Sequence, residues 1–291
     1  MTYPRLAAFA RLASGNAEPV REIAGQASKL TRVAHGIAYD PVHDEILASE
    51  PLASSVVVFP GGATGQVAPK RVIQGSKTKL HDPWQVIVDN AHGEILVADD
   101  TLNGILVFPR TANGNVAPLR VVQSRGMEGV GGVAVDPKRN LLFAGSYHYR
   151  GGGIFVFHRT DNGDVKPLTV IRGPKTGIRG VWHLAVYRDL LFATVVNVNY
   201  IPPYDKGGFR PRKGVTGPAL AWRGDPGFVG VWKVTDQGDA APLAVVRGAA
   251  TGLLHPSGLA LDPSDGDVFA TDSFRNGFYR FIVPSFFTAK K

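Results

Sequence analysis

Histidines occupy a recurring place in this chain of 291 residues, at or just before the start of a short apolar segment. His35 precedes GIAYD, His183 begins HLAVY and His255 lies shortly before GLALD, while His81 stands four residues before QVIVD. Neutral imidazole is the commonest nitrogen ligand of zinc, copper and iron. Imidazoles that converge from several such segments would hold a metal ion and leave coordination positions open for water or a substrate.

A second group of chemically useful side chains lies in one long, irregular insertion, residues 197–227. It mixes aromatic and cationic residues, among them Tyr200, Tyr204 and Arg210. Such side chains can cover a pocket, stack on a ligand or bind an anionic group. A loop folded over its own aromatic cluster, or a contact between subunits, explains the same composition. A shorter segment at 146–153 adds Tyr147, His148, Tyr149 and Arg150.

The elements that carry these residues belong to an internal repeat. Five segments share one motif with a central proline, at Pro19, Pro69, Pro118, Pro167 and Pro242. The prolines recur every 49 or 50 residues, and the last interval of 75 contains the insertion. Each repeat also has an apolar segment that usually ends in Asp, a second such as EILVAD and a third such as ILVF. These segments are rich in β-branched and aromatic residues and end in turn-forming residues, so each repeat holds four short strands.

Four strands in each repeat of about 50 residues are typical of a β-propeller blade. The sequence therefore predicts an all-β, single-domain propeller over residues 1–291, with inner strands at 36–40, 85–89, 132–136, 183–187 and 258–262. Five repeats favour five four-stranded blades. The third kind of strand occurs six times, however, because 6–16 aligns without gaps on 105–115, and a sixth, incomplete blade is the alternative. With five blades, the strand at 19–24 would join the C-terminal blade and close the ring without an exposed edge.

The repeat has an inner strand that ends in Asp-Pro, then a segment such as FATD, and then a strand that ends in an aromatic residue. This order resembles the pattern of NHL-type and lactonase-like propellers. The resemblance implies that the Asp-ending strands surround the axis and that the proline-containing strands lie outermost. Loops before the inner strands and links from second to third strands then share one face, which we call the top. His35, His183, His255, His148 and the insertion 197–227 all fall on this face.

The residue just before the inner strand differs from repeat to repeat, and it is His35, Trp84, Gly131, Trp182 or Ser257. A binding site on a pseudo-symmetric ring must break the symmetry, so variation at one position favours a site there. We therefore expect Trp84 and Trp182 to contact a substrate, together with Tyr200, Tyr204 and Arg210.

The histidines are similar in arrangement to those of peptide-amidating lyases, which are propellers that hold zinc with inner-strand histidines. This resemblance implies His35, His183 and His255 as ligands of a divalent metal, which would be zinc, iron or copper. Calcium is the alternative by comparison with propeller lactonases. Those lyases have disulfides, whereas this chain has no cysteine. His148, Tyr149 and Arg150 would supply proton transfer and anion binding.

Two functions follow from these residues. The first is a metal-dependent enzyme, a lyase, hydrolase or oxygenase, that acts on a small polar or anionic substrate at the top of the axis. The alternative is a non-catalytic propeller whose top binds a ligand or a protein.

Charge and hydropathy narrow the partners. The net charge is +8, yet apart from RPRK at 210–213 the Lys and Arg residues are scattered singly. No nucleic-acid-binding motif occurs either, so the sequence does not favour nucleic acid as a partner. No run of eighteen apolar residues predicts a membrane span. The chain as written begins without a signal-peptide pattern, which leaves the compartment open, including the periplasm or secretion if a signal was removed.

Overall fold

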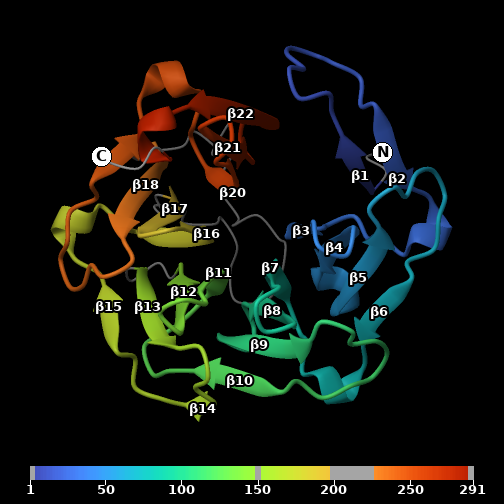
Figure 1. Ribbon diagram of the computed structural model, residues 1–291, viewed down its shortest axis with the longest axis horizontal. Helices are drawn as coiled ribbons and strands as arrows, with labels where there is room; N and C mark the ends of the chain where they lie inside the picture. The colour runs from blue at the N-terminus through green and yellow to red at the C-terminus, as the bar shows by residue number, and fades with distance from the viewer. Residues whose placement is uncertain (1–3, 148–151, 197–225, 288–291) are drawn as a thin grey trace, which may run out of the picture.

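Sheets of the protein follow one another around a central axis in the computed structural model, which describes residues 4–147, 152–196 and 226–287 (Figure 1). Five inner strands surround the axis, and each is followed outward by antiparallel partners in chain order. The structure is thus the five-bladed β-propeller that the repeats predict. No helix among the described residues is long and apolar enough to span a membrane.

The strands of each blade have the following bounds. Blade 1 contains β3 (Ile37–Asp40), β4 (Glu45–Glu50), β5 (Ser55–Pro60) and β6 (Arg71–Gln74). Blade 2 contains β7 (Pro83–Asp89), β8 (Glu94–Asp99), β9 (Gly104–Pro109) and β10 (Arg120–Gln123). Blade 3 contains β11 (Val130–Asp136), β12 (Leu141–Ser146), β13 (Gly153–His158) and β15 (Thr169–Ile171), and blade 4 contains β16 (Gly180–Tyr187), β17 (Leu190–Val196), β18 (Phe228–Lys233) and β19 (Ala244–Val246). Blade 5 contains β20 (Pro256–Asp262), β21 (Asp267–Asp272) and β22 (Gly277–Ile282).

The remaining elements are short. An N-terminal hairpin consists of β1 (Arg5–Ala8) and β2 (Arg21–Ala24), and β14 (Gly163–Asp164) pairs in parallel with β10. Single 3-10 turns lead from one element to the next at η1 (Gln26–Ser28), η2 (Pro51–Ala53), η3 (Ser76–Thr78), η4 (Pro174–Thr176), η5 (Ala249–Thr251) and η6 (Pro284–Phe286).

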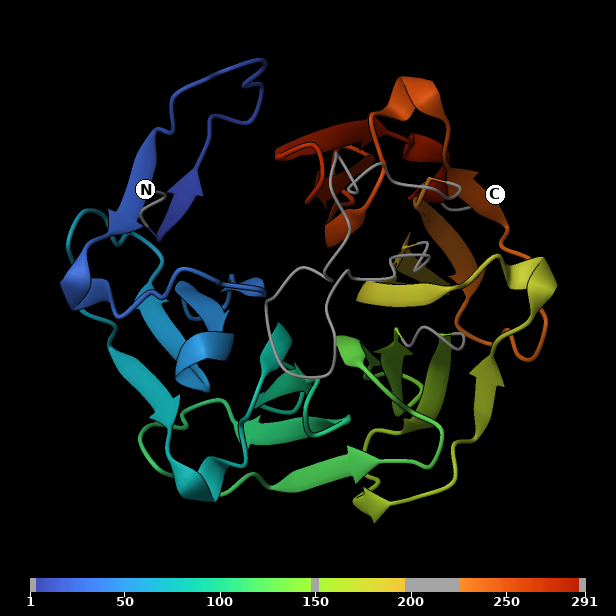
Figure 2. The same cartoon turned by 180° about the vertical axis from the view of Figure 1, so that it is seen from behind.

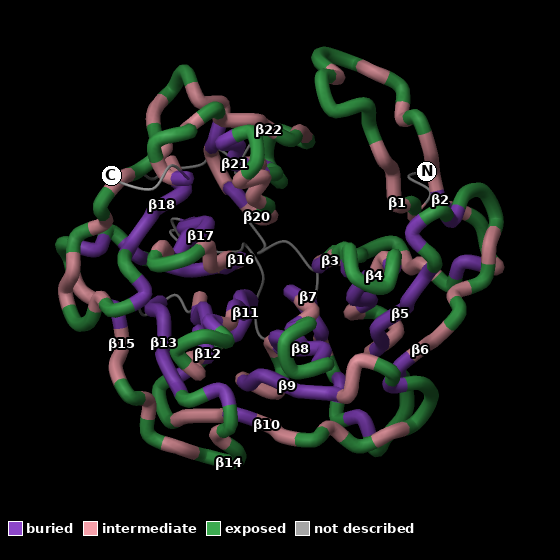
Figure 3. The backbone as a smooth tube through the Cα atoms, in the orientation of Figure 1, coloured by how far each residue is buried: buried purple, intermediate pink, exposed green. Residues whose placement is uncertain are grey.

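The core lies between the blades, where the apolar faces of neighbouring sheets meet. Leu47 and Val56 of blade 1, for example, share one cluster with Val86 and Leu106 of blade 2. The second and third strands of blades 1 to 4 are therefore buried along nearly their whole length, and they are largely purple in Figure 3. Blade 5 is less well covered, because most residues of β20 and β22 are only half-buried or exposed.

The predicted closure of the ring by a shared sheet is wrong for the described residues. Strand β2 pairs with β1 instead of β22, and blade 5 has three strands. A local hairpin needs only a short loop to close, whereas pairing with β22 joins segments about 250 residues apart. Among the described residues, side-chain contacts span the seam: the rings of Phe9 and Phe278 have centroids 5.7 Å apart, and Arg11 donates to Asp267 at 2.9 Å. The view from behind in Figure 2 shows the same seam between the hairpin and blade 5.

Candidate functional site

A β-bulge interrupts four of the inner strands near their top ends. The pairing register shifts between Pro83 and Val86 in β7, and similar shifts occur at 130–132, 181–183 and 256–258. The residues left out of the ladder include those of the variable position, which are Trp84, Gly131, Trp182 and Ser257. Bulges re-aim side chains and are frequent next to active sites. The repeat thus presents different side chains from an otherwise shared scaffold.

Aromatic rings from all five blades meet around the top of the axis and form what we call the axial cluster. Trp84 contacts Trp182 edge-on at 4.8 Å between ring centroids and stacks on Tyr147 at 4.9 Å. The ring centroid of His35 lies 4.4 Å from that of Trp84, and the ring centroid of His255 lies 4.7 Å from that of Trp182. Phe274 stacks on His255 at 4.7 Å and is 46% exposed. The structure therefore brings together four predicted residues, His35, Trp84, Trp182 and His255.

Backbone hydrogen bonds hold the loops that carry this cluster. Asp272, buried at the end of β21, accepts from the N–H groups of Leu254 and His255 at 2.7 and 2.6 Å. Ser49 accepts from the N–H of Gly36 at 2.7 Å and donates to the carbonyl of Trp84, so it ties blade 1 to blade 2.

Gln85 fixes the inner strands to one another beneath the cluster. Its side-chain oxygen accepts from the N–H groups of Val133 and Leu184 at 2.8 and 3.0 Å, and its amide donates to the Leu184 carbonyl at 2.8 Å. One buried side chain of β7 therefore joins β11 and β16. Sequence reasoning missed Gln85 and Phe274, although an amide within an otherwise apolar inner strand was a visible signal for the former.

Three of the described histidines, His35, His183 and His255, favour the neutral form at pH 7. Burial lowers the pKa of His35 and of His255 below the ordinary value. Burial, together with the neighbouring His35, lowers the pKa of His183 to about 4. Neutral imidazoles neither attract nor repel a charged ligand strongly, and their ring nitrogens can accept or donate hydrogen bonds.

A carboxyl group at the rim of the cluster titrates near neutrality. Burial and the adjacent Asp82 raise the pKa of Asp100 to about 6, and the Tyr147 hydroxyl hydrogen-bonds to it. Burial and Asp100 raise the pKa of Tyr147 above its ordinary value, so the phenol stays protonated. The pair offers one carboxyl and one hydroxyl at the edge of the aromatic rings.

Two hydrogen-bond donors within the axial cluster have no acceptor among the described residues. They are the indole N–H groups of Trp84 and Trp182, and both nitrogens are buried. Trp232, which lies farther out in blade 4, donates its indole N–H to the Ala240 carbonyl at 3.1 Å. A buried indole N–H usually finds a partner, so two neighbouring donors without one are a departure that calls for an acceptor from elsewhere.

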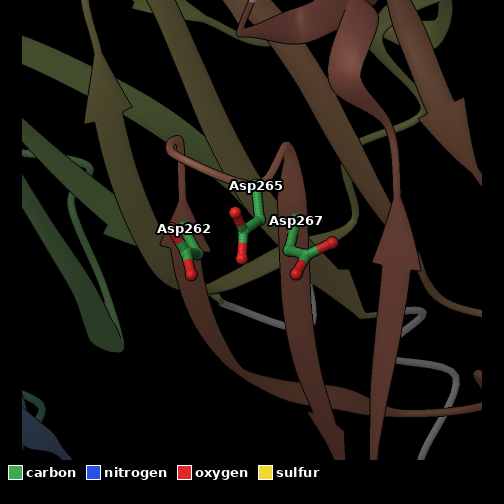
Figure 4. Close-up of side chains that lie close together, drawn as sticks. All are labelled: Asp262, Asp265 and Asp267. Carbon is green, nitrogen blue, oxygen red and sulfur yellow. The ribbon is translucent and has the colours of Figure 1, made fainter. Parts of the chain in front are cut away.

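The donor set does not fit a three-histidine metal centre. Within the described part of the chain, the group that brings three ligand atoms within 4.8 Å of one another is Asp262, Asp265 and Asp267, and His35, His183 and His255 do not form such a group. His255 hydrogen-bonds through Nδ1 to Ser273 at 2.9 Å, a contact that does not involve its Nε2. The three aspartates, shown in Figure 4 around the β20–β21 turn, all make ion pairs with Arg11, and Asp267 also pairs with Arg280, so two guanidinium groups offset part of the negative charge.

Several predicted site residues lie outside the described residues. They are His148, Tyr149 and Arg150, and from the insertion Tyr200, Tyr204 and Arg210. The roles expected for them stay predictions.

Comparisons with known proteins agree with the propeller architecture. No protein-family model matches the chain, and no curated protein does. Among solved structures, the Kuenenia stuttgartiensis hydrazine synthase is similar with a TM-score of 0.54 at 11% identity, over 83% of this chain and 57% of that one. The WD40 propeller domain of Doa1 gives 0.53 at 12% identity over 90% and 71% of the two chains. A nidogen/laminin complex gives 0.50 at 16% over 88% and 82%.

At these identities the likeness extends to the fold alone, and this chain spans less than two thirds of the hydrazine synthase chain. The similar structures include propellers of different kinds, which leaves the NHL or lactonase type without support of its own. The conclusion that the comparisons and the geometry share is that this chain is a β-propeller.

Proposed function

We propose that this chain is a ligand-binding propeller that takes a small molecule at the top of its axis. A flat or apolar part of the ligand stacks at the rim of the axial cluster, and a carbonyl or carboxylate of the ligand accepts from the indole N–H groups of Trp84 and Trp182. The observation that carries this proposal is the pair of buried indole donors without an acceptor among the described residues.

The surroundings of the two donors support an acceptor-bearing ligand. Tyr147 keeps its proton, so the phenol places no negative charge beside the donors. A ligand acceptor would supply the hydrogen bonds that the indoles otherwise lack in the folded protein. Each such bond would stabilise the complex by about 1 kcal/mol. Aromatic rings supply flat contact area at a low entropic cost.

A matched series of probes tests the proposal. Benzoate, benzamide and benzylamine share one ring, but only the first two carry a carbonyl acceptor. We expect benzoate and benzamide to raise the melting temperature at millimolar concentration and benzylamine to have a smaller effect. Trp182→Phe keeps an aromatic ring and removes the donor, so binding of benzoate should weaken about fivefold.

Trp232→Phe is the control, because it removes an indole donor that is bonded to Ala240, away from the axis. Equal affinity for benzoate in the wild-type chain, Trp84→Phe and Trp182→Phe would refute the assignment of these donors. A failure of all three probes to bind would refute the class of ligand.

A metal-dependent enzyme is the second candidate. The observation that favours it is that burial keeps His35, His183 and His255 neutral, which is the form of imidazole that binds a metal. Their spacing does not favour it. Elemental analysis of untagged protein after reconstitution with zinc separates the candidates: about one zinc per chain, lost in His183→Phe, would support the enzyme, and metal-free protein would support the binding propeller.

A further inference from the structure

A repeated ion pair links blade 1 to blade 2 and blade 2 to blade 3. Blade 1 places Glu45 at the start of its second strand, and Arg110, which follows the third strand of blade 2, donates to it at 3.2 Å. Arg159 of blade 3 donates in the same way to Glu94 of blade 2 at 2.7 Å. In each case the arginine comes from a Phe-x-Arg segment of the following blade.

Arg11 obeys the same rule across the seam. It belongs to Phe9-Ala10-Arg11 after β1, and it donates to Asp267 at the start of the second strand of blade 5. By this rule β1 stands where the third strand of a blade after blade 5 would stand. The hairpin of β1 and β2 thus occupies the position of the outer half of a sixth blade. The alignment of 6–16 on 105–115 also indicates this position.

The outer strand β2 confirms this position from its other side. Ile23 of β2 bridges in parallel to Gly65 of blade 1, and Ile73 of β6 bridges in the same way to Gly114 of blade 2. The relation of β2 to blade 1 is therefore that of any outer strand to the blade that follows it. Figures 1 and 2 show the hairpin at the rim of the ring, with no described strand between it and the axis.

The second and inner strands of this sixth blade are missing from the described residues. Apolar residues of the strands on either side are exposed as a result. Ile37 of β3 is 60% exposed, whereas Val86, Val133 and Leu184, which hold the same place in the next three blades, are at most 1% exposed. On the opposite wall Phe278 of β22 is 47% exposed. Its counterparts Val56, Ile105, Ile154 and Val229 are buried. We call the space bounded by β1, β3 and β22 the open sector.

A cation in the open sector also lacks its usual partner. Arg71, the first residue of β6, binds Glu45 of its own blade through two bonds of 2.7 Å, and it donates to the Arg110 carbonyl. Arg21, the first residue of β2, donates to the equivalent carbonyl, that of Gly61, but it makes no ion pair with any residue that the structure describes. The acid missing here is the one that begins the second strand of a blade.

We propose that the open sector binds a two-stranded β-hairpin of a partner protein, whose second strand begins with Asp or Glu. This second strand adds to the free edge of β1, as β4 adds to β5, and its acid pairs with Arg21. The first strand faces the axis, and apolar side chains of both strands cover Ile37 and Phe278. The occupant is therefore a partner segment with the pattern of the chain's own repeats.

The probe is a peptide with residues 83–99 of this chain, the sequence of β7 and β8, in which Glu94 supplies the acid. Fluorescence anisotropy of the labelled peptide with the full chain should show saturable binding below about 1 mM. The Glu94→Gln peptide and the Arg21→Gln chain should each bind at least fivefold more weakly. The double change should cost no more than either single change, because both remove the same ion pair.

Arg125→Gln is the control, since Arg125 makes an exposed ion pair with Asp164, away from β1, β3 and β22, and should leave peptide binding unchanged. An isolated hairpin pays an ordering cost, so the peptide is also attached after Lys291 through a flexible linker, which raises its effective concentration to about millimolar. The tethered chain should melt at a higher temperature than the chain with a tethered Glu94→Gln peptide.

Three results would overturn the proposal. One is the absence of both peptide binding and stabilisation by the tethered peptide. Another is binding that ignores Arg21 and Glu94. The third is a dimer in sedimentation velocity that the peptide dissociates, which would make a second copy of this chain the occupant.

Discussion

Arg11 and Asp267 are 256 positions apart in the chain and are joined by a hydrogen bond of 2.9 Å between Nη2 and Oδ2. Arg280 donates to the same oxygen at 2.7 Å, so the buried carboxylate receives one guanidinium from its own blade and one from the N-terminal hairpin. The first and last parts of the propeller are thus joined by charged side chains rather than by a backbone ladder.

Removal of Arg11 should loosen this junction. In Arg11→Ala, Asp267 keeps Arg280, and because the Arg11 side chain is 46% exposed, we expect the free energy of unfolding to fall by only about 1 kcal/mol. The larger effect should be local, with faster hydrogen exchange in residues 5–24. Arg5→Ala breaks an exposed pair within the hairpin and should change neither quantity measurably. Unchanged exchange in the Arg11 variant would show that the Phe9–Phe278 contact alone holds the seam.

Gln85→Leu should destabilise the whole ring. The substitution keeps the approximate volume but leaves the N–H groups of Val133 and Leu184 without an acceptor in a buried place. Each loss costs about 1–3 kcal/mol, so urea denaturation should show a decrease of about 3 kcal/mol or more. The control is Gln74→Leu, because Gln74 is exposed and makes one amide bond, to the Ala53 carbonyl. A loss in Gln85→Leu no larger than in the control would contradict the bridging role.

Gly36→Ala should also be costly, because an added Cβ would collide with the Trp84 carbonyl and the Val86 amide of the neighbouring blade. Neither group can move without shifting an inner strand, so we expect a loss of about 2–4 kcal/mol in thermal or urea unfolding. Gly62→Ala meets nothing within 4 Å and should change stability little. Similar stability of the two variants would mean that blades 1 and 2 are less tightly packed at the axis than described.

The pH dependence of stability should carry a contribution from Asp100. Because folding raises its pKa from the ordinary 3.8 to about 6, the folded state binds this proton more tightly than the unfolded state does. The contribution is fully present below about pH 4 and is lost as the pH rises through about 6. It amounts to at most about 3 kcal/mol. The difference in unfolding free energy between wild type and Asp100→Asn should therefore vary over this pH range and be constant above about pH 7.5. A constant difference throughout would contradict the raised pKa.

The repeat predicted the strands well because each blade depends on local signals, such as the alternation in EILVAD and the turn residues around it. The alignment of 6–16 on 105–115 even located β1 correctly as a third kind of strand. The partner of β2 was predicted wrongly, because an unpaired edge was assumed to be intolerable. The structure pairs β2 locally with β1, and no described strand pairs with the outer edge of β22.

The axial cluster was predictable in part. Trp84 and Trp182 stood out because the repeat varies at their position, and both do meet at the axis. Phe274 did not stand out, since it lies in a turn beyond β21 and its stacking on His255 depends on the loop geometry that Asp272 fixes. Whether three imidazoles converge depends on distances between several blades. The spacing of residues along the sequence does not give those distances.

The bulges at the top ends of the inner strands also bear on how such a ring diversifies after its repeats have duplicated. A residue outside the pairing ladder can change without altering the cross-strand partners of its neighbours, so mutations at Trp84, Trp182 and Ser257 are separated from those that set blade geometry. Ser257 is half-buried, and its hydroxyl shares a hydrogen bond with Thr271 within the part of the chain that the structure describes. A new specificity could therefore arise at this position with the least disturbance. The side chain that each of these blades places near the axis can thus vary independently of the paired strands that support it.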